Sequence, residues 1–526
     1  MVPPSASHPE DGRSAAAAAR FASEMRALAT DPLDPLNVDR RDFGVLEAAR
    51  AAGFALVDVR RFGVAADGVT DDSARFQEAI DTLSLAGGGV LAVPRGTYAI
   101  LTGLVWREGV SLAGEGWESV FAMGGTDLRQ QGGIIDAMRI DDVFFADFAI
   151  TGEGESNGIS LHGCNRVTVR NVKVAFSSSR SNTGCICIYD DGSHERGTST
   201  GIRVTGCHLQ PSALAVLAQG DPVGPFWLED IVVDNNLVDG VAADPGTYEG
   251  IKIDLHSRAF NVSGNVIRGR ERIRVGIHSE EDVTDGRISG NVVDACTSRG
   301  IRIDGGQTSG AVQRVLITNN TVYGMRGAGR AGIGIDSRPG SAFREIRVHG
   351  NVISDVQNGI REATPDSRDL TITDNVINGF TDQGIYVRSP RTVITGNSIA
   401  AAAGVLAGAI VADSTATNCL IAGNYLGASS ARGVVLSGSG AAGLVVRDNT
   451  GLSALGSGRA TLPAGAVSVV VGHGLGVIPT ADIVLTPISG WGGATAPRVV
   501  AVTTAEFTVF VDRAPEHPVV FEWAVR

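Results

Sequence analysis

A short motif of alternating apolar and polar residues recurs through the middle of the chain. Its full form runs from Gly-Ile to an acidic residue at 250–254, 276–280, 300–304 and 332–336, and shorter versions follow at 359–362 and 384–388. Alternation with a period of two predicts strands whose isoleucines point into a core and whose intervening side chains point outward. Repetition at a spacing of one coil predicts parallel strands that stack in register.

A second repeat predicts a turn in each coil. An Asn followed by two mostly apolar or β-branched residues recurs, with steps of 22 to 31 residues from Asn236 onward, and Cys207 stands in the same place one coil earlier. Asn suits a tight turn because it tolerates left-handed dihedral angles and its amide bonds to local backbone. We therefore expect an internal, structural ladder at Asn171, Asn236, Asn265, Asn291, Asn320, Asn351, Asn375, Asn397, Asn424 and Asn449.

The two ends of the chain differ from these coils. Residues 13–30 and 43–52 have helical patterns with Pro32 and Pro35 between them, which predicts a helical arm or attachment segment over 1–55. The coils themselves are expected over 56–452. Residues 458–526 carry short apolar runs separated by turn residues, which predicts a small antiparallel β-sandwich over 453–526.

The first coils carry a distinctive passage. Residues 61–80 read RFGVAADGVTDDSARFQEAI, in which Asp72 or Ser73 can cap a helix, and short strands follow at 90–93 and 110–113. This passage closely resembles the N-terminal cap and first coils of the pectate-lyase-like superfamily, which includes polygalacturonases, alginate epimerases and phage tailspikes. The resemblance implies an all-β, right-handed parallel β-helix, a fold that several enzyme classes and binding proteins share.

Composition narrows the range of partners. The formal net charge of −13 argues against a nucleic-acid surface, which needs clustered Lys and Arg. No apolar run approaches the ~18 residues of a membrane span, and the polar start of the chain does not look like a leader peptide. We therefore expect no membrane insertion, and synthesis in the cytoplasm followed either by residence there or by release in a virus-like particle.

The repeated motif gives a candidate site, because alignment of its strands would stack outward side chains in two columns. The first column holds Lys252, His278, Arg302, Gly334, Arg361 and Tyr386, and the second holds Asp254, Glu280, Asp304 and Asp336. Coils lie ~4.8 Å apart, so carboxylates one coil apart match the spacing of retaining glycosidases and those two coils apart match the inverting spacing. Stacked acids also raise one another's pKa, which would supply a proton donor near neutral pH.

We predict catalytic roles for Asp254, Glu280 and Asp304. Lys252, His278, Arg302 and Asp336 are predicted to bind substrate, and the cations among them could neutralise a uronate or a sulfate. The alternative remains open that these charges only keep a solvent-facing wall soluble.

Other substrate-binding candidates lie outside the repeat. The turn at 189–196 carries Asp190, Asp191 and His194, which also fit an ordinary polar loop. Trp227 and Tyr248 are candidate stacking platforms for sugar rings, or core residues. Cys185 and Cys187 lack a second ligand pair at a spacing suited to zinc, and we predict no metal and no cofactor.

These features favour a virion-type spike or tail fibre that binds a bacterial capsule or lipopolysaccharide outside the host cell, and they leave open whether it also cleaves that polysaccharide. The resemblance implies a homotrimer, with attachment to a particle through the N-terminal segment. Two alternatives are a free carbohydrate-active enzyme (a glycoside hydrolase, a polysaccharide lyase or an intramolecular glycosyl transferase) and a non-enzymatic adhesin. Either alternative is compatible with the same fold.

Overall fold

The chain is described by a computed structural model that divides into two units. These are Met1–Thr297 and Ser298–Arg526, called the N-terminal and the C-terminal unit below and considered one at a time. The described residues are 55–124, 132–153, 156–177, 183–190, 199–221, 227–241, 248–305, 312–336, 343–364, 366–405, 408–427, 432–437, 442–451, 457–472, 483–488, 490–494, 496–503 and 506–525. The predicted helical arm over 1–55 therefore lies almost wholly outside them.

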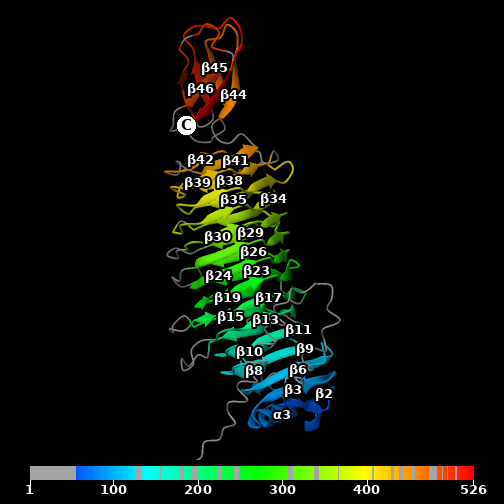
Figure 1. Cartoon of the computed structure of the whole chain (residues 1–526). Helices are drawn as coiled ribbons and strands as arrows, with labels where there is room; N and C mark the ends of the chain where they lie inside the picture. Colours follow the sequence, from blue (N-terminus) through cyan, green and yellow to red (C-terminus); the bar gives the residue numbers. More distant parts are fainter. Residues whose placement is uncertain are drawn as a thin grey trace, which may run out of the picture. The chain divides into compact units, whose positions relative to one another are not determined.

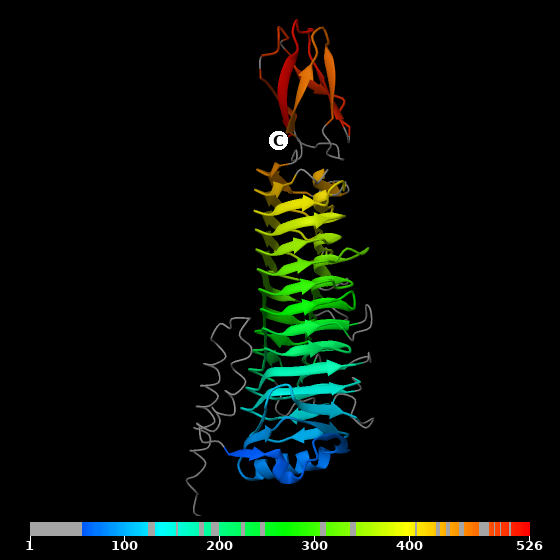
Figure 2. The same ribbon diagram turned by 90° about the vertical axis from the view of Figure 1, so that its right-hand side faces the viewer.

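The N-terminal unit is a stack of coils whose strands pair in parallel (Figures 1 and 2). Its first wall carries the repeated motif and consists of β5 (Leu104–Trp106), β8 (Gly133–Met138), β10 (Asn157–His162), β12 (Gly184–Tyr189), β15 (Leu214–Gln219), β19 (Tyr248–Asp254) and β23 (Ile273–Glu280). Each strand is hydrogen-bonded to the strand one coil away, so the wall is a parallel sheet with its inner face on the core.

Two further walls complete these coils. The second wall is formed by β1 (Leu56–Asp58), β3 (Gly89–Val93), β6 (Val110–Gly114), β9 (Phe144–Gly152), β11 (Thr168–Phe176), β13 (Arg203–Thr205), β17 (Val232–Asp234), β21 (Asn261–Ser263) and β24 (Val283–Ser289). The third wall contains β2 (Asp67–Asp71), β4 (Gly96–Ile100), β7 (Ser119–Met123), the far ends of β9 and β11, then β14 (His208–Gln210), β18 (Leu237–Asp239), β22 (Val266–Arg268) and β25 (Val292–Asp294). Two short strands, β16 (Leu228–Glu229) and β20 (Ser257–Arg258), pair with each other, and β20 also pairs with β24.

The C-terminal unit repeats the same three walls. Its first wall is β26 (Arg299–Asp304), β29 (Ala331–Asp336), β32 (Asn358–Glu362), β35 (Gln383–Val387), β38 (Gly408–Asp413) and β41 (Arg432–Ser437). The second is β27 (Gln313–Thr318), β30 (Arg347–His349), β33 (Thr371–Thr373), β36 (Val393–Thr395), β39 (Leu420–Ala422) and β42 (Val445–Arg447). The third is β28 (Thr321–Tyr323), β31 (Val352–Ser354), β34 (Val376–Phe380), β37 (Ser398–Ala401), β40 (Tyr425–Leu426) and β43 (Thr450–Gly451). Both units are therefore parallel β-helices, and the all-β prediction is confirmed.

The predicted cap of the first coils is present. Helix α3 (Ser73–Leu85) follows a 3-10 turn, η2 (Val59–Phe62), and buries Phe76 against Tyr98 with ring centroids 5.2 Å apart. Asp72 precedes the helix, but its carboxylate accepts hydrogen bonds from the backbone of Ala65 (2.6 Å) and Ala66 (3.1 Å) and not from the helix. Among the described residues, no helix is long and apolar enough to cross a lipid bilayer.

The predicted ladder is present, with one change in its physical reason. In the C-terminal unit each Asn, such as Asn351, accepts bonds from the backbone and side chain of the previous coil's Asn320 (3.0 and 2.9 Å). Asn236 likewise accepts from the Cys207 backbone at 2.9 Å, whereas Asn171 bonds to Asp147 instead. The left-handed backbone belongs to the residue before the ladder Asn, for example Asn319 with φ 55°. The ladder Asn is therefore selected for its buried amide.

The residues after the coils form antiparallel sheets. One sheet has the order β44 (Ser457–Leu462), β49 (Val519–Val525) and β46 (Ile483–Pro487), and the other has β45 (Ser468–Gly472), β48 (Glu506–Phe510) and β47 (Arg498–Val500). Phe507, Phe521 and Trp523, from both sheets, share one apolar cluster. Antiparallel strands at these positions agree with the sequence pattern, while the domain boundaries stay a prediction.

Candidate functional site

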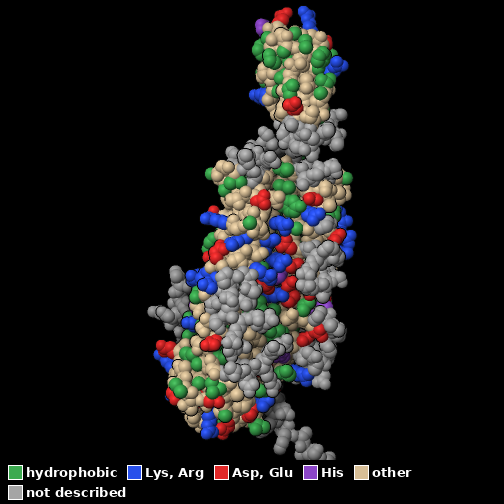
Figure 3. Space-filling model, turned by 180° about the vertical axis from the view of Figure 1, so that it is seen from behind, with side chains coloured by type: hydrophobic (Ala, Val, Ile, Leu, Met, Phe, Trp, Pro, Cys, Tyr) green, Lys and Arg blue, Asp and Glu red, His purple; other side chains and the backbone are tan. Residues whose placement is uncertain are grey.

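The outward side chains of the first wall stack in register, as the motif predicts. In the N-terminal unit Lys252 lies opposite His278 and Asp254 lies opposite Glu280. In the C-terminal unit one column runs Arg302, Gly334, Arg361, Tyr386, and Asp304 lies opposite Asp336. Figure 3 shows that Lys and Arg side chains gather together with Asp and Glu side chains over the middle coils.

Lys252 joins the two acidic side chains of the N-terminal unit. Its Nζ lies 2.8 Å from Asp254 Oδ2 and 2.7 Å from Glu280 Oε2. The two carboxylate oxygens can therefore be at most about 5.5 Å apart, the sum of these distances. The Asp254 side chain is 5% exposed and that of Glu280 is 19% exposed, so a ligand on the wall can reach Glu280 and meets Asp254 at its inner edge.

The two carboxyl groups titrate in opposite directions. Burial raises the pKa of Asp254 to about 6, against the lowering effect of Lys252 and with a smaller contribution from the charge of Glu280. Burial also acts on Glu280, but the His278 ring and the Lys252 ammonium outweigh it and hold its pKa below the usual value. Asp254 therefore has the raised pKa that a proton donor near neutral pH needs, with burial and not acid stacking as the main cause, and its catalytic role stays a prediction.

His278 is fully buried beneath these charged groups. Its Nδ1 lies 3.0 Å from Glu249 Oε1 and 3.7 Å from Glu280 Oε2. Burial would raise the pKa of Glu249, but His278, Lys252 and Arg274 together hold it well below its usual range. Arg274 forms an ion pair with the same Glu249 oxygen. His278 therefore holds carboxylates in place, and the predicted direct contact with substrate would require it to become exposed.

Glu249 and Arg274 were not predicted from the sequence. For Glu249 the reason is that strict alternation would turn the residue before the motif's Gly inward, whereas Arg274 lies outside the motif that was used to find the site. The register between β19 and β23 is irregular at this point, where Glu249 pairs with Val275 and Tyr248 with Ile273. A Cβ on Gly250 would lie 2.4 Å from the Gly276 carbonyl oxygen and 3.4 Å from the core residue Ile267. Gly250 thus lets the strand bend so that the side chain before it joins the outer cluster.

The backbone after both carboxylates is unusual. Leu255 and His256, directly after Asp254, have φ of 38° and 43°, and Glu281 and Asp282, directly after Glu280, have φ of 47° and 46°. Two successive left-handed residues without glycine are costly, and such backbone persists only where its surroundings hold it. His256 Nε2 and Asp282 Oδ2 lie 2.7 Å apart and join the two turns. These turns fix the ends of the strands that carry Asp254 and Glu280.

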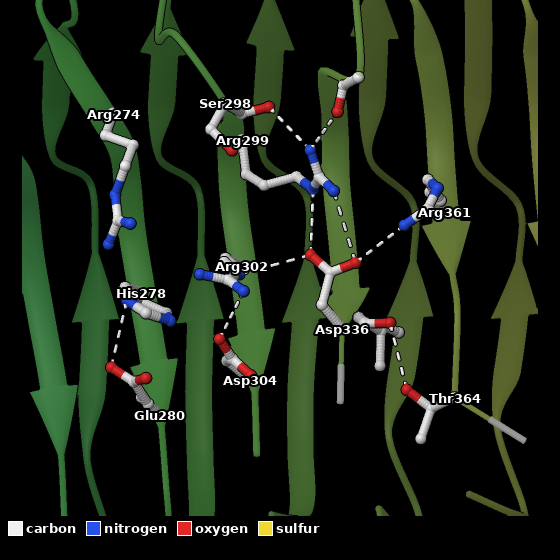
Figure 4. Close-up of polar contacts among 12 residues, drawn as sticks. Arg274, His278, Glu280, Ser298, Arg299, Arg302, Asp304, Asp336, Arg361 and Thr364 are labelled. Carbon is white, nitrogen blue, oxygen red and sulfur yellow. Dashed lines mark hydrogen bonds and ion pairs between the residues drawn. The ribbon is translucent and has the colours of Figure 1, made fainter. Parts of the chain in front are cut away.

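In the C-terminal unit Asp336 is surrounded by arginines (Figure 4). Its carboxylate lies 3.1 Å from Arg299 Nε, 3.0 Å from Arg361 Nη1 and 3.4 Å from Arg302 Nε. Arg302 also pairs with Asp304, Nη2 to Oδ2, at 2.5 Å. The catalytic role predicted for Asp304 stays a prediction, and the structure places this residue 6% exposed against Arg302.

The remaining candidates are only partly described. Trp227 packs its ring 5.0 Å from His256 and 5.6 Å from the Arg258 guanidinium, so it lies beside the turn that follows Asp254. Asp190 directly follows β12 and is half-buried. Asp191 and His194 lie outside the described residues, and for Tyr248 only the backbone is described. No stacking or binding role follows for these residues from the structure.

Two protein-family models together match nearly all the coils. The family described as rhamnogalacturonase A/epimerase, pectate lyase-like, matches residues 56–302. The family described as right handed beta helix region matches residues 307–454. The first match covers the coils of the N-terminal unit and ends in β26, and the second lies on the coils of the C-terminal unit, so both agree with the parallel walls described above.

Two curated proteins are similar in sequence. The mannuronan C5-epimerase AlgE4 of Azotobacter vinelandii is 41% identical over 66 residues, which is 11% of this chain and 12% of the epimerase. The uncharacterized protein YclG of Bacillus subtilis is 23% identical over 384 residues, 65% of this chain and 62% of YclG. The chain thus spans less than two thirds of either relative.

Several solved structures with similar folds come from bacteriophages. A mutant tailspike protein of E. coli bacteriophage HK620 has a TM-score of 0.58 at 12% identity, covering 96% of this chain and 99% of the tailspike. A structure of that tailspike in complex with a pentasaccharide has a TM-score of 0.56 at 14% identity, with 89% and 94% covered. Gene product 12 of bacteriophage phi29 scores 0.52 at 17% identity, with 76% and 58% covered. At these identities the likeness concerns the fold.

Proposed function

The chain belongs to the pectate-lyase-like superfamily of right-handed parallel β-helix proteins, and we propose that it binds a polysaccharide along its first wall and hydrolyses it. One observation carries the proposal: a single ammonium group, that of Lys252, contacts both Asp254 and Glu280, whose pKa values are shifted in opposite directions. A pair of carboxyl groups held in different protonation states is what glycoside hydrolysis requires.

Asp254 acts as the general acid in this proposal. With a pKa of about 6, Asp254 is protonated in a fraction of the molecules near neutral pH. In these molecules it gives its proton to the glycosidic oxygen as the bond breaks. Its 5% exposed side chain lies at the inner edge of the wall, where only a bound sugar would reach it. Once deprotonated, the same group takes a proton from the water that completes the reaction.

Glu280 acts as the nucleophile. Lys252 and His278 keep it ionised, and its oxygen is at most about 5.5 Å from that of Asp254. Retaining glycosidases place their carboxyl groups ~5–5.5 Å apart, whereas inverting enzymes need ~6.5–9.5 Å to admit a water. We therefore infer a covalent glycosyl ester on Glu280, which water hydrolyses with retention of configuration.

A long saccharide suits this wall because each coil adds one outward side chain to the same column. Upstream of Asp254 its column continues through Gln219, Tyr189 and His162, and the Tyr189 and His162 rings stack 4.9 Å apart. The pentasaccharide bound to the HK620 tailspike and the mannuronan named for the epimerase support a polysaccharide as the ligand.

Size-exclusion chromatography of bacterial capsules and lipopolysaccharides after incubation with the protein tests this function. We expect shorter chains with new reducing ends from the wild type. E280Q should slow cleavage by about 10⁴-fold or more, because the covalent step loses its nucleophile. D239N is the matched control, because Asp239 is similarly buried and paired with Arg270 but lies on the third wall.

Two results would overturn hydrolysis, and a third would overturn the role of Glu280 in it. Products with unsaturated-uronate absorbance would indicate elimination. Polysaccharide that is bound but intact would indicate a recognition protein. Equal cleavage by the wild type and E280Q would remove Glu280 from the mechanism.

We also propose that the chain is a homotrimeric spike of a phage or phage-derived particle, acting outside the cell and attached through its N-terminal segment. The phage proteins that share the fold support this role. Mass photometry of the purified full chain tests the trimer, and immunogold electron microscopy of particles tests the location. A monomer found only in the cytosolic fraction would contradict both.

A further inference from the structure

We propose that the arginines around Asp336 form a binding site for an acidic group of the polysaccharide, a uronate carboxylate or a sulfate ester, and that Asp336 pairs with Arg361 and Arg302 until this acidic group takes its place beside them. The inference rests on the proposed function and adds the substrate class. It concerns the C-terminal unit alone, and its residues are drawn in Figure 4.

The charges of this cluster do not balance. Arg299, Arg302 and Arg361 face two carboxylates, those of Asp336 and Asp304. One positive charge is therefore in excess among the five side chains. Arg299 is only 10% exposed and is paired with Asp336 at 3.1 Å, so the unbalanced charge lies with the more exposed Arg361, which shares that carboxylate. An anion that enters the cluster would be favoured by this excess.

The cluster has an anchored part and a reachable part. Arg299 is anchored because its Nη1 also donates to the carbonyl oxygens of Ser298 (3.2 Å) and Gly329 (2.5 Å). Arg361 is the most exposed of the three arginines at 34%, and Arg302 is 23% exposed. A ligand on the wall would therefore meet Arg361 and Arg302 first, while Arg299 keeps Asp336 in place.

A glycine makes room for this arrangement. Gly334 occupies the outward position of β29 between Arg302 and Arg361. A Cβ at Gly334 would lie 2.5 Å from Arg299 Nε and 3.1 Å from Asp336 Oδ2. Arg299 thus crosses β29 through the space that a side chain would fill, and the arginines of two neighbouring strands converge on one carboxylate.

Arg361 is held ready by an aromatic ring. Its guanidinium lies 5.9 Å from the centre of the Tyr386 ring, and the Tyr386 hydroxyl donates to Asp413 at 3.1 Å. A planar guanidinium that stacks on an aromatic ring and pairs with an oxyanion suits carboxylate and sulfate groups. Since Asp336 is itself a carboxylate, it shows where the ligand's acidic group would lie.

Two substitutions with opposite expected effects test the site. R361Q removes the most exposed cation, and binding of an acidic polysaccharide should weaken about tenfold or more, the loss of one charge-assisted contact. D336N removes the competing carboxylate while keeping its shape, and binding should become about threefold tighter or more at low salt. R391Q is the matched control, because Arg391 pairs with Asp369 through Nε and Nη2 outside the first wall.

The probes are the polysaccharide that the full chain retains, the same material after carboxyl reduction or desulfation, and inorganic sulfate, all measured by isothermal titration calorimetry. The difference in affinity between the wild type and R361Q should vanish for the polysaccharide that has lost the acidic group bound at this site. Loss of the difference after carboxyl reduction would identify a carboxylate, and loss after desulfation would identify a sulfate. Circular dichroism and thermal midpoints check that each variant is folded. Inorganic sulfate should bind to D336N more tightly than to the wild type. It should bind to R361Q more weakly than to the wild type.

The outcomes separate the two proposals. Polysaccharide binding that is unchanged in R361Q, or weakened in D336N, overturns the acidic-group site while the proposed function stands. If the protein retains no polysaccharide but sulfate binding changes as expected in both variants, the proposed function is overturned and an anion site is supported. Sulfate binding that is unaffected by both substitutions overturns the site by itself.

Discussion

Replacing Asp254 by asparagine should make the protein's stability less dependent on pH between pH 4 and 7. Asp254 has a pKa of about 6 in the folded chain, against 3.8 for an ordinary aspartate. A raised pKa means that the folded state binds the proton more tightly than the unfolded chain does. The resulting stabilisation is fully present below pH 3.8 and is lost as the pH rises through about 6.

The magnitude follows from the size of the shift. One pKa unit corresponds to about 1.4 kcal/mol, so a shift from 3.8 to about 6 corresponds to roughly 3 kcal/mol of unfolding free energy. The Asp254 side chain is 5% exposed, so solvent does little to screen it. An asparagine side chain cannot ionise, and D254N should therefore gain roughly 2.5 kcal/mol relative to the wild type between pH 4 and pH 7, the range over which most of this stabilisation is lost.

Urea unfolding at several pH values from 4 to 8 measures this difference. Groups far from Asp254 titrate equally in both proteins and cancel when the two free energies are subtracted. D81N is the control, because burial is outweighed by hydrogen bonds from Arg107 and Gln77 and the pKa of Asp81 is lowered. The stabilisation that ionised Asp81 gives is lost only at more acidic pH. The difference in unfolding free energy between D81N and the wild type should therefore stay constant from pH 5 to 8. A D254N difference that is flat across pH 4 to 7, or of opposite sign, would show that folding does not raise the pKa of Asp254.

Three further results are expected. K252M should move the whole pH–activity profile to higher pH, because Lys252 lowers the pKa of both Asp254 and Glu280; a lower optimum would contradict this. G359A should cost about 2–3 kcal/mol in urea unfolding, since its Cβ would lie 2.3 Å from a carbonyl oxygen of the next coil, while G472A, which meets no atom within 4 Å, should change stability by less than about 0.5 kcal/mol. N351A leaves a buried backbone N–H of the previous coil unbonded and should cost about 3 kcal/mol; a cost below about 1 kcal/mol would refute the structural role of the ladder.

The fold could be predicted from the sequence because the same strand and turn motifs recur in successive coils of a β-helix. The Gly-Ile motif predicted the register of Lys252 with His278 and of Asp254 with Glu280, and the structure has that register. Inward isoleucines such as Ile251 and Ile277 are fully buried. Each coil constrains the next, so an error in one coil would conflict with its neighbours.

The candidate site could be predicted only in outline. Alternation hides Glu249, because the irregular register beside Gly250 turns its side chain outward. Arg299 was missed for a related reason, since it reaches Asp336 only because Gly334 has no side chain. The opposite pKa shifts of Asp254 and Glu280 depend mainly on burial and on shared partners, and neither can be read from the spacing of residues in a sequence.

The anomeric configuration of the first product tests the central claim most directly. Proton NMR recorded during cleavage of the retained polysaccharide shows the configuration of the new reducing end before it equilibrates. We expect the configuration of the original linkage, because the oxygens of Asp254 and Glu280 are at most about 5.5 Å apart. The inverted configuration, an unsaturated sugar at the new end, or no cleavage at all would contradict the assignment of Asp254 and Glu280 as acid and nucleophile.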